Sequence, residues 1–159
     1  MPESRLRTLP ATLLLKEDHQ KIKELMEKYE ELGQDETEQK EDIFAMLRAE
    51  LSDHATIEEE IFYPAIAQVD VSDAEERVQE AEEEHKIVRT LLDEMSELSP
   101  GELEFEAKMK VLQEGVLHHA AEEEKKLFKI FKKLPRDVQD DISERLRDRK
   151  IELGEESGG

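Results

Sequence analysis

His54-Ala-Thr-Ile-Glu58 and His119-Ala-Ala-Glu-Glu123 are the two stretches of this sequence that decide its fold. In each stretch a histidine precedes a glutamate by four residues, a spacing that places both side chains on one face of an α-helix. Two further histidines, His19 and His85, extend the series, so that successive members lie 35, 31 and 34 residues apart. This near-constant interval predicts one histidine at a similar depth in each helix of a four-helix bundle.

The apolar residues around each histidine repeat with the period of an amphipathic helix. In the first helix, steps of four, three, four and three residues connect Leu15, His19, Ile22, Met26 and Tyr29. The same spacing passes through the other histidines within residues 43–65, 78–95 and 112–134. Each apolar face is therefore interrupted at a histidine, and the second and fourth faces also at the glutamate one turn later.

Turn-forming residues separate the predicted helices, at 33–37, 71–73 and 99–101, and Pro135 ends the fourth helix. Each histidine lies about 15–18 residues from its turn, roughly 25 Å along a helix, so the four should share one layer. We therefore expect an all-α fold, an up-down-up-down four-helix bundle over residues 10–134. A short C-terminal helix over 135–152 and a disordered tail over 153–159 should follow.

An internal duplication supports two equivalent helical hairpins. His19 and His85 are 66 residues apart, and both His54 to His119 and Glu58 to Glu123 span 65 residues. Each hairpin thus contributes one lone histidine followed by one HxxxE motif.

The composition limits the classes of function. The chain has 159 residues, a formal charge of −20 and no cysteine, which excludes disulfides, zinc fingers and iron–sulfur ligation. The acidic charge argues against a nucleic-acid partner, and no apolar run approaches the roughly 18 residues that cross a bilayer. We expect no membrane partner, a monomer or weak dimer, and, by default, a cytoplasmic location.

Four imidazoles and two carboxylates that converge in a bundle suit two divalent metal ions better than one. Each ion could take two imidazoles and share bridging carboxylates with the other. Mixed nitrogen and oxygen donors without thiolate favour iron, with manganese or zinc as possible substitutes. If these histidines bound no metal, they would be core residues bonded to neighbouring helices.

This combination of motifs resembles the hemerythrin-like, or HHE cation-binding, family over roughly residues 10–134. The matching segments are Leu15-Lys-Glu-Asp-His19, His54-x-x-x-Glu58-Glu59 before Phe62-Tyr63-Pro64, the lone His85, and His119-x-x-x-Glu123-Glu124 before Leu127-Phe128. The resemblance implies a non-haem centre of two iron ions bridged by two carboxylates and an oxo or hydroxo group. Its implied ligands are His19, His54, Glu58, His85, His119 and Glu123.

Three neighbouring features need separate interpretation. Oxygen carriers of the family have a second histidine one turn before the third-helix one, where this chain has Ala81. That position could be taken by water or a nearby acid, or left open, and an open position favours redox turnover over oxygen carriage. His118 is turned about 100° from His119 and should lie outside the cluster. Tyr29 and Tyr63 are expected to pack in the core, although either could lie near the site.

Several functions remain open from the sequence. The centre could react with O2, peroxide or NO, with a peroxidase- or catalase-like activity as one form. It could instead bind O2 or NO reversibly, or sense iron without turnover. A ferritin-like oxidase or iron store is less favoured, because only Glu82-x-x-His85 matches the Glu-x-x-His motif of that class. A helical interaction protein without metal is the remaining alternative.

Overall fold

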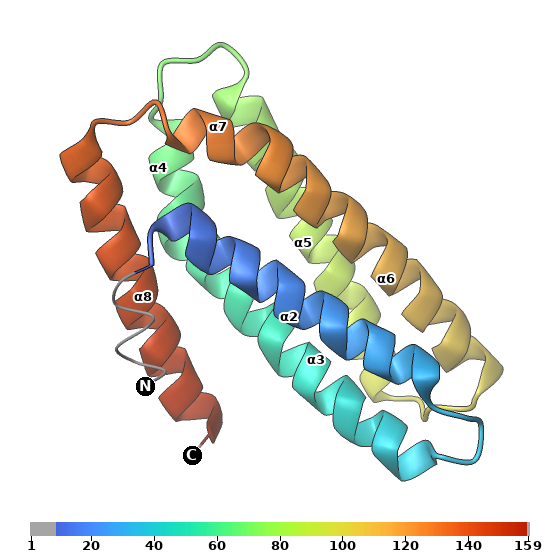
Figure 1. The fold of residues 1–159 in the computed structure, drawn as a ribbon. Helices are drawn as coiled ribbons and strands as arrows, with labels where there is room; N and C mark the ends of the chain where they lie inside the picture. The colour runs from blue at the N-terminus through green and yellow to red at the C-terminus, as the bar shows by residue number, and fades with distance from the viewer. Residues whose placement is uncertain (1–8, 159) are drawn as a thin grey trace.

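The computed structural model describes residues 9–158, and every regular element in that range is helical. Four long helices form the bundle: α2 (Ala11–Glu31), α3 (Thr37–Ile57), α5 (Ala74–Ser96) and α6 (Leu103–Glu122). They run alternately up and down as two hairpins, α2–α3 and α5–α6 (Figure 1). The predicted all-α four-helix bundle is therefore confirmed.

Two short π-helical segments continue the second and fourth bundle helices. η1 (Glu58–Phe62) extends α3 and leads into α4 (Tyr63–Ala67), while η2 (Glu123–Leu127) extends α6 and leads into α7 (Phe128–Phe131). Each segment begins at the glutamate of an HxxxE motif. Such single-turn widenings of an α-helix are frequent at functional sites.

The fifth helix, α8 (Arg136–Gly158), packs on α2, α3 and η1 and lies along one side of the bundle (Figure 1). It was expected to be short and to end near residue 152, with a disordered tail after it. Instead the helix continues through almost all of that tail. Leu153, the first residue after the predicted helix, is buried in the core, and this contact holds the start of the added segment against the bundle.

The apolar interior consists of two separate clusters. The first joins α8 to the upper ends of the bundle helices and includes Leu14, Phe62 and Phe128. The second fills the opposite end and includes Met26 and Leu112. The residues between these clusters are polar and buried, and they include three of the four histidines of the predicted layer.

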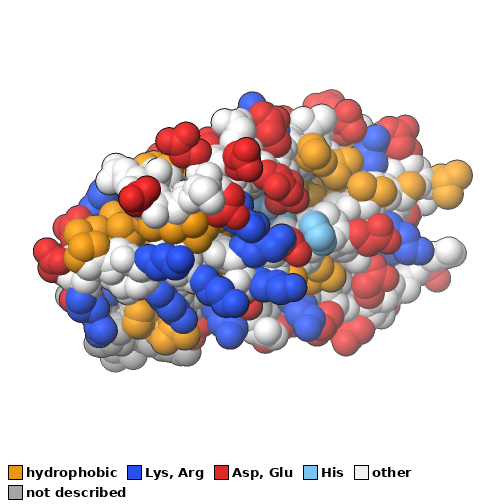
Figure 2. All heavy atoms as spheres, turned by 90° about the horizontal axis from the view of Figure 1, so that it is seen from above, with side chains coloured by type: hydrophobic (Ala, Val, Ile, Leu, Met, Phe, Trp, Pro, Cys, Tyr) orange, Lys and Arg blue, Asp and Glu red, His pale blue; other side chains and the backbone are white. Residues whose placement is uncertain are grey.

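The surface is mostly acidic but not uniformly so. Seen from above the bundle, Lys and Arg side chains gather across the middle of one face and acidic side chains surround them (Figure 2). Within residues 9–158, no helix combines the length and apolar character needed to span a bilayer.

Candidate metal centre

The structure brings all six predicted donors together in the polar layer between the apolar clusters. They come from every helix of the bundle: His19 from α2, His54 from α3, Glu58 from η1, His85 from α5, His119 from α6 and Glu123 from η2. We call His19 with His54 the first half-site, and His85 with His119 the second half-site. Both glutamates are buried, with exposed fractions of 0% and 1%.

Glu58 lies between the two half-sites. Its Oε2 atom is 3.3 Å from His54 Nε2 in the first half-site, and its Oε1 atom is 3.1 Å from His85 Nε2 in the second. One carboxylate therefore presents one oxygen to each pair of imidazoles.

Glu123 repeats this arrangement from the other hairpin. Its Oε1 atom is 3.1 Å from His19 Nε2, and its Oε2 atom is 3.3 Å from His119 Nε2. The donor atoms thus form two groups: His19, His54 and both glutamates in the first, and His85, His119 and Glu58 in the second, which Glu123 contacts through His119. The duplication seen in the sequence is a pseudo-twofold arrangement of the site.

Four further carboxylates fix the orientation of the histidines. Each accepts a hydrogen bond from the Nδ1–H of one imidazole, at 2.6–2.8 Å. A carboxylate at Nδ1 sets the tautomer that leaves the Nε2 lone pair for a metal. The pairs are His19 with Glu124, His54 with Asp18, His85 with Glu59, and His119 with Glu84.

Sequence reasoning missed these outer carboxylates, although a signal was present. An acid directly precedes each lone histidine, as Asp18 and Glu84, and directly follows each donor glutamate, as Glu59 and Glu124. The pattern repeats between the two hairpins. Because 43 of the residues are acidic, neighbouring acids alone do not distinguish a role.

Tyr63 was expected to pack in the core, but its hydroxyl lies inside the cluster. It donates a hydrogen bond to Glu123 Oε2 at 2.7 Å, and it is 3.3 Å from His85 Nε2 and 3.2 Å from His119 Nε2. The phenol therefore lies at the second half-site. This is the half-site whose helix carries Ala81, so a phenol stands near the position that was expected to be open or taken by water or an acid.

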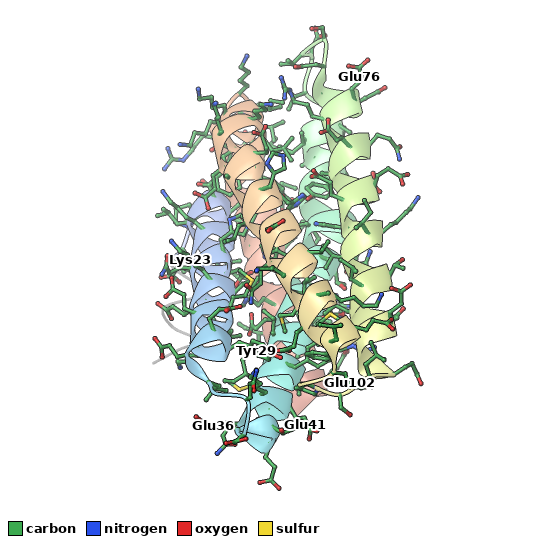
Figure 3. The ribbon with its side chains drawn as sticks, turned by 90° about the vertical axis from the view of Figure 1, so that its right-hand side faces the viewer. Lys23, Tyr29, Glu36, Glu41, Glu76 and Glu102 are labelled. Carbon is green, nitrogen blue, oxygen red and sulfur yellow. The ribbon has the colours of Figure 1, made fainter. Side chains whose placement is uncertain are left out.

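His118 and Tyr29 lie outside the cluster. His118 is exposed on α6, as its position on the helix predicted. Tyr29 donates to Glu106 Oε2 at 2.5 Å, and Glu106 also accepts from the buried Lys40. Figure 3 shows Tyr29 near the end of the bundle that holds Glu102, opposite the end that holds Glu76. Tyr29 therefore belongs to the packing of the bundle end.

Buried charge perturbs the protonation of the cluster. Burial would lower the pKa of His54, but the charge of Glu58 and hydrogen bonds with Asp18 and Glu123 raise it well above its usual value. Burial likewise opposes protonation of His119, yet hydrogen bonds to Glu123 and Glu84 raise its pKa to about 10. Without metal, these two imidazoles hold protons, and the protons supply positive charge between the carboxylates.

The pKa values of Tyr63 and Glu123 are shifted in opposite directions. Burial and the charges of Glu58 and Glu123 raise the pKa of Tyr63, so the hydroxyl keeps its proton and donates. Burial would raise the pKa of Glu123, but hydrogen bonds within the cluster hold it well below its usual value. Glu123 is therefore an anion that can serve as a metal ligand.

The donor set fits divalent metal. His54 Nε2 and Glu58 Oε2 are buried, form no hydrogen bond of good geometry and lie 3.3 Å apart, so a cation that displaced the imidazolium proton would find two donor atoms there. Six carboxylates contact the histidines, and within residues 9–158 the cations in direct contact with those carboxylates are Lys150 and Arg89. The remaining four negative charges match two divalent ions.

Helix α8 reaches this cluster through one side chain. Lys150 pairs with Oδ1 of Asp18, and Oδ2 of the same carboxylate accepts the hydrogen bond from His54. Asp18 is only 3% exposed, and burial, which would raise the pKa of its carboxyl, is outweighed by His54 and Lys150, which lower it. The fifth helix therefore helps to hold a histidine of the first half-site.

Replacing Lys150 with methionine is expected to destabilise the metal-free fold by about 2–3 kcal/mol, because it removes one of the two cationic partners, Lys150 and His54, that hold the buried Asp18 carboxylate. The matched control is Arg149→Met on the same helix. It removes an ion pair to Glu60, which is about half exposed, and should have little effect. Urea denaturation of both metal-free variants measures the difference. Equal stability of the two variants would show that Lys150 is an ordinary surface contact.

Comparison with known proteins agrees with this geometry. The family model described as hemerythrin HHE cation-binding domain matches residues 11–131. A crystal structure of a hemerythrin HHE cation-binding domain-containing protein from Mycobacterium kansasii superposes with a TM-score of 0.78 and 25% identity, over 92% of this chain and 88% of that one.

A protein from Nostoc sp. strain PCC 7120, described as a DNA nickase, is 30% identical over 116 residues. The match covers 72% of this chain but only 31% of the length of that protein. Because the family model matches residues 11–131, well over half of the sequence and a range that contains all six candidate donors, this chain belongs to the hemerythrin HHE cation-binding family.

Proposed function

We propose that this protein binds two iron ions, one at each half-site, and uses them to react with a small oxidant. The observation that carries the proposal is that Glu58 and Glu123 each present one oxygen to each half-site. A carboxylate in that position can bridge two metals, and nitrogen and oxygen donors without thiolate suit iron, with manganese or zinc as substitutes. A reduced pair of iron ions would supply electrons to O2, NO or a peroxide.

The side chains of this protein have separable roles in that function. The four imidazoles hold the ions, and their outer carboxylates keep the Nε2 atoms directed inward. Tyr63 holds a proton at the second half-site, 2.7 Å from Glu123, where it can hydrogen-bond to a reactant oxygen or give up that proton. A proton donor next to the centre favours chemistry that consumes protons, as peroxide reduction does.

The test of the metal assignment is stoichiometry. Protein loaded anaerobically with ferrous iron and then desalted should contain two ions per chain, because each half-site offers two imidazoles and at least one glutamate oxygen. Metal analysis gives the number directly. A carefully loaded sample that retains one ion or fewer would contradict the proposal.

Reversible binding of O2 or NO, or iron sensing without turnover, is the second candidate function. The burial of the cluster favours it, because Glu58 and Glu123 are shielded from water that would promote turnover. Optical spectra of the loaded protein after addition of O2, NO and hydrogen peroxide separate the two functions. Multiple rounds of peroxide consumption support turnover, whereas a spectrum that returns to its starting form when the gas is removed supports reversible binding.

A further inference from the structure

A cavity of about 180 Å³ lies beside the histidine layer, between the two helical hairpins. All four half-site histidines line it. Neither glutamate of the cluster lines it, and Tyr63 does not either, so the cavity adjoins the imidazole side of the centre. Its other walls are mainly apolar and come from all four bundle helices; they include Ile22, Leu51, Ala55, Val88, Leu92 and Val116.

The volume is larger than a diatomic molecule needs. An apolar protein cavity of about 150 Å³ holds benzene, while one water molecule takes a share of about 30 Å³ in the liquid. Molecular oxygen and nitric oxide each have only two heavy atoms. The space beside the histidines therefore suits an organic molecule of about the size of benzene or somewhat larger.

The charges around the cavity favour an uncharged occupant. Arg48 and Arg89 line its exposed edge, but both are already paired. Arg48 lies 3.1 Å from Asp93, and Arg89 lies 2.8 Å from Glu59, the carboxylate that holds His85. The acids already balance the charge of both arginines, so an anion would gain little at this edge and would leave water for apolar walls, which carries a large desolvation cost.

We propose that this cavity binds an uncharged organic hydroperoxide, with its apolar, benzene-sized body in the cavity and its hydroperoxyl group directed at the histidine layer. The inference rests on the proposed function and narrows its reactant class, from small oxidants in general to organic ones. The apolar walls hold the body, and the imidazole edges offer the head group a polar surface beside the metal centre. Hydrogen peroxide, which is small and polar, gains little from such walls.

The probe for this site is 2-phenyl-2-propanol, which has a benzene-sized apolar body and a hydroxyl head group. It does not oxidise the metal ions. Binding to the zinc-loaded protein is followed by calorimetry and by the methyl NMR signals of Val88, Leu92 and Val116. Ala55→Leu adds three carbons at a buried position of the cavity wall. The matched control is Ala107→Leu, the same change at an exposed position of α6.

We expect the wild-type protein to bind the alcohol with shifts at the three cavity residues, and benzene to compete with it. Ala55→Leu should weaken binding at least about tenfold, because leucine occupies the space of the ligand, while Ala107→Leu should stay within about twofold of wild type. The competition by benzene needs no variant, so it tests the site even if Ala55→Leu does not fold.

Two results overturn the inference: absence of saturable binding to the wild-type protein, or equal affinity in wild type and a folded Ala55→Leu variant. Failure of the proposed function has a different signature. If the protein binds the alcohol but does not hold two metal ions, the cavity site stands and the proposed di-metal function is wrong. If the protein holds two metal ions but binds neither the alcohol nor benzene, the di-metal function stands and the proposed class of reactant is wrong.

Discussion

His119→Ala is expected to remove metal from the second half-site, with a loss of affinity greater than the roughly 10–100-fold that follows removal of an outer hydrogen-bond partner. The imidazole is buried between two carboxylates: Nδ1 donates to Glu84 at 2.6 Å, and Nε2 lies 3.3 Å from Glu123. Its loss deletes one donor nitrogen and leaves both acids without that contact. Iron analysis and a titration with a competing chelator measure the effect.

The matched control is His118→Ala, the adjacent residue of the same helix. His118 is exposed and turned away from the cluster, so this variant should keep both metal ions and the wild-type melting temperature. The pair of variants has the same composition, which separates a ligand from a general effect of losing a histidine. Equal metal loss in both variants would contradict the assignment of His119 to the inner face of α6 and of His118 to its outer face.

Removing the metal is expected to lower the melting temperature by about 10–20 °C. A ligand present at 100 times its Kd stabilises the native state by about 2.7 kcal/mol per site, and each kcal/mol shifts the melting of a domain of this size by about 2–4 °C. The physical reason is the charge of the site, where six carboxylates surround the histidines but Lys150 and Arg89 supply only two balancing charges. Protonated His54 and His119 compensate only part of this charge.

Circular dichroism melts of the same sample, before and after treatment with a chelator and after reloading with ferrous iron, test this expectation. Reloading should restore the higher melting temperature. Superimposable curves in all three states would contradict the idea that the cluster depends on metal for its stability.

The sequence by itself determined the helices and the meeting of the six donors. The helical period of the apolar residues and the positions of the turn residues place one histidine at the same depth in each helix. Side chains that are equidistant from a turn lie at the same height in the two antiparallel helices that the turn connects. The four-residue step from His54 to Glu58 and from His119 to Glu123 does the same for the glutamates. These are local regularities of an α-helix, so spacing alone was sufficient.

Only the tertiary structure decided which groups surround those donors. Lys150 meets Asp18 across 132 residues because α8 packs against α2 and α3, and nothing in the local sequence specifies that contact. Tyr63 enters the second half-site from the end of η1, where the helical repeat is locally wider than that of an α-helix. A pattern based on 3.6 residues per turn could not assign its direction.

The C-terminal segment also differs between what its sequence predicts and what the tertiary structure shows. Residues 153–159 are rich in glycine and glutamate, a composition that predicts disorder when the segment is considered alone. In the structure α8 runs on to Gly158, and Leu153, at the start of this segment, is buried against the bundle. Sequence patterns record local propensity, whereas contacts between distant segments, such as the burial of Leu153, add free energy that local propensity does not contain.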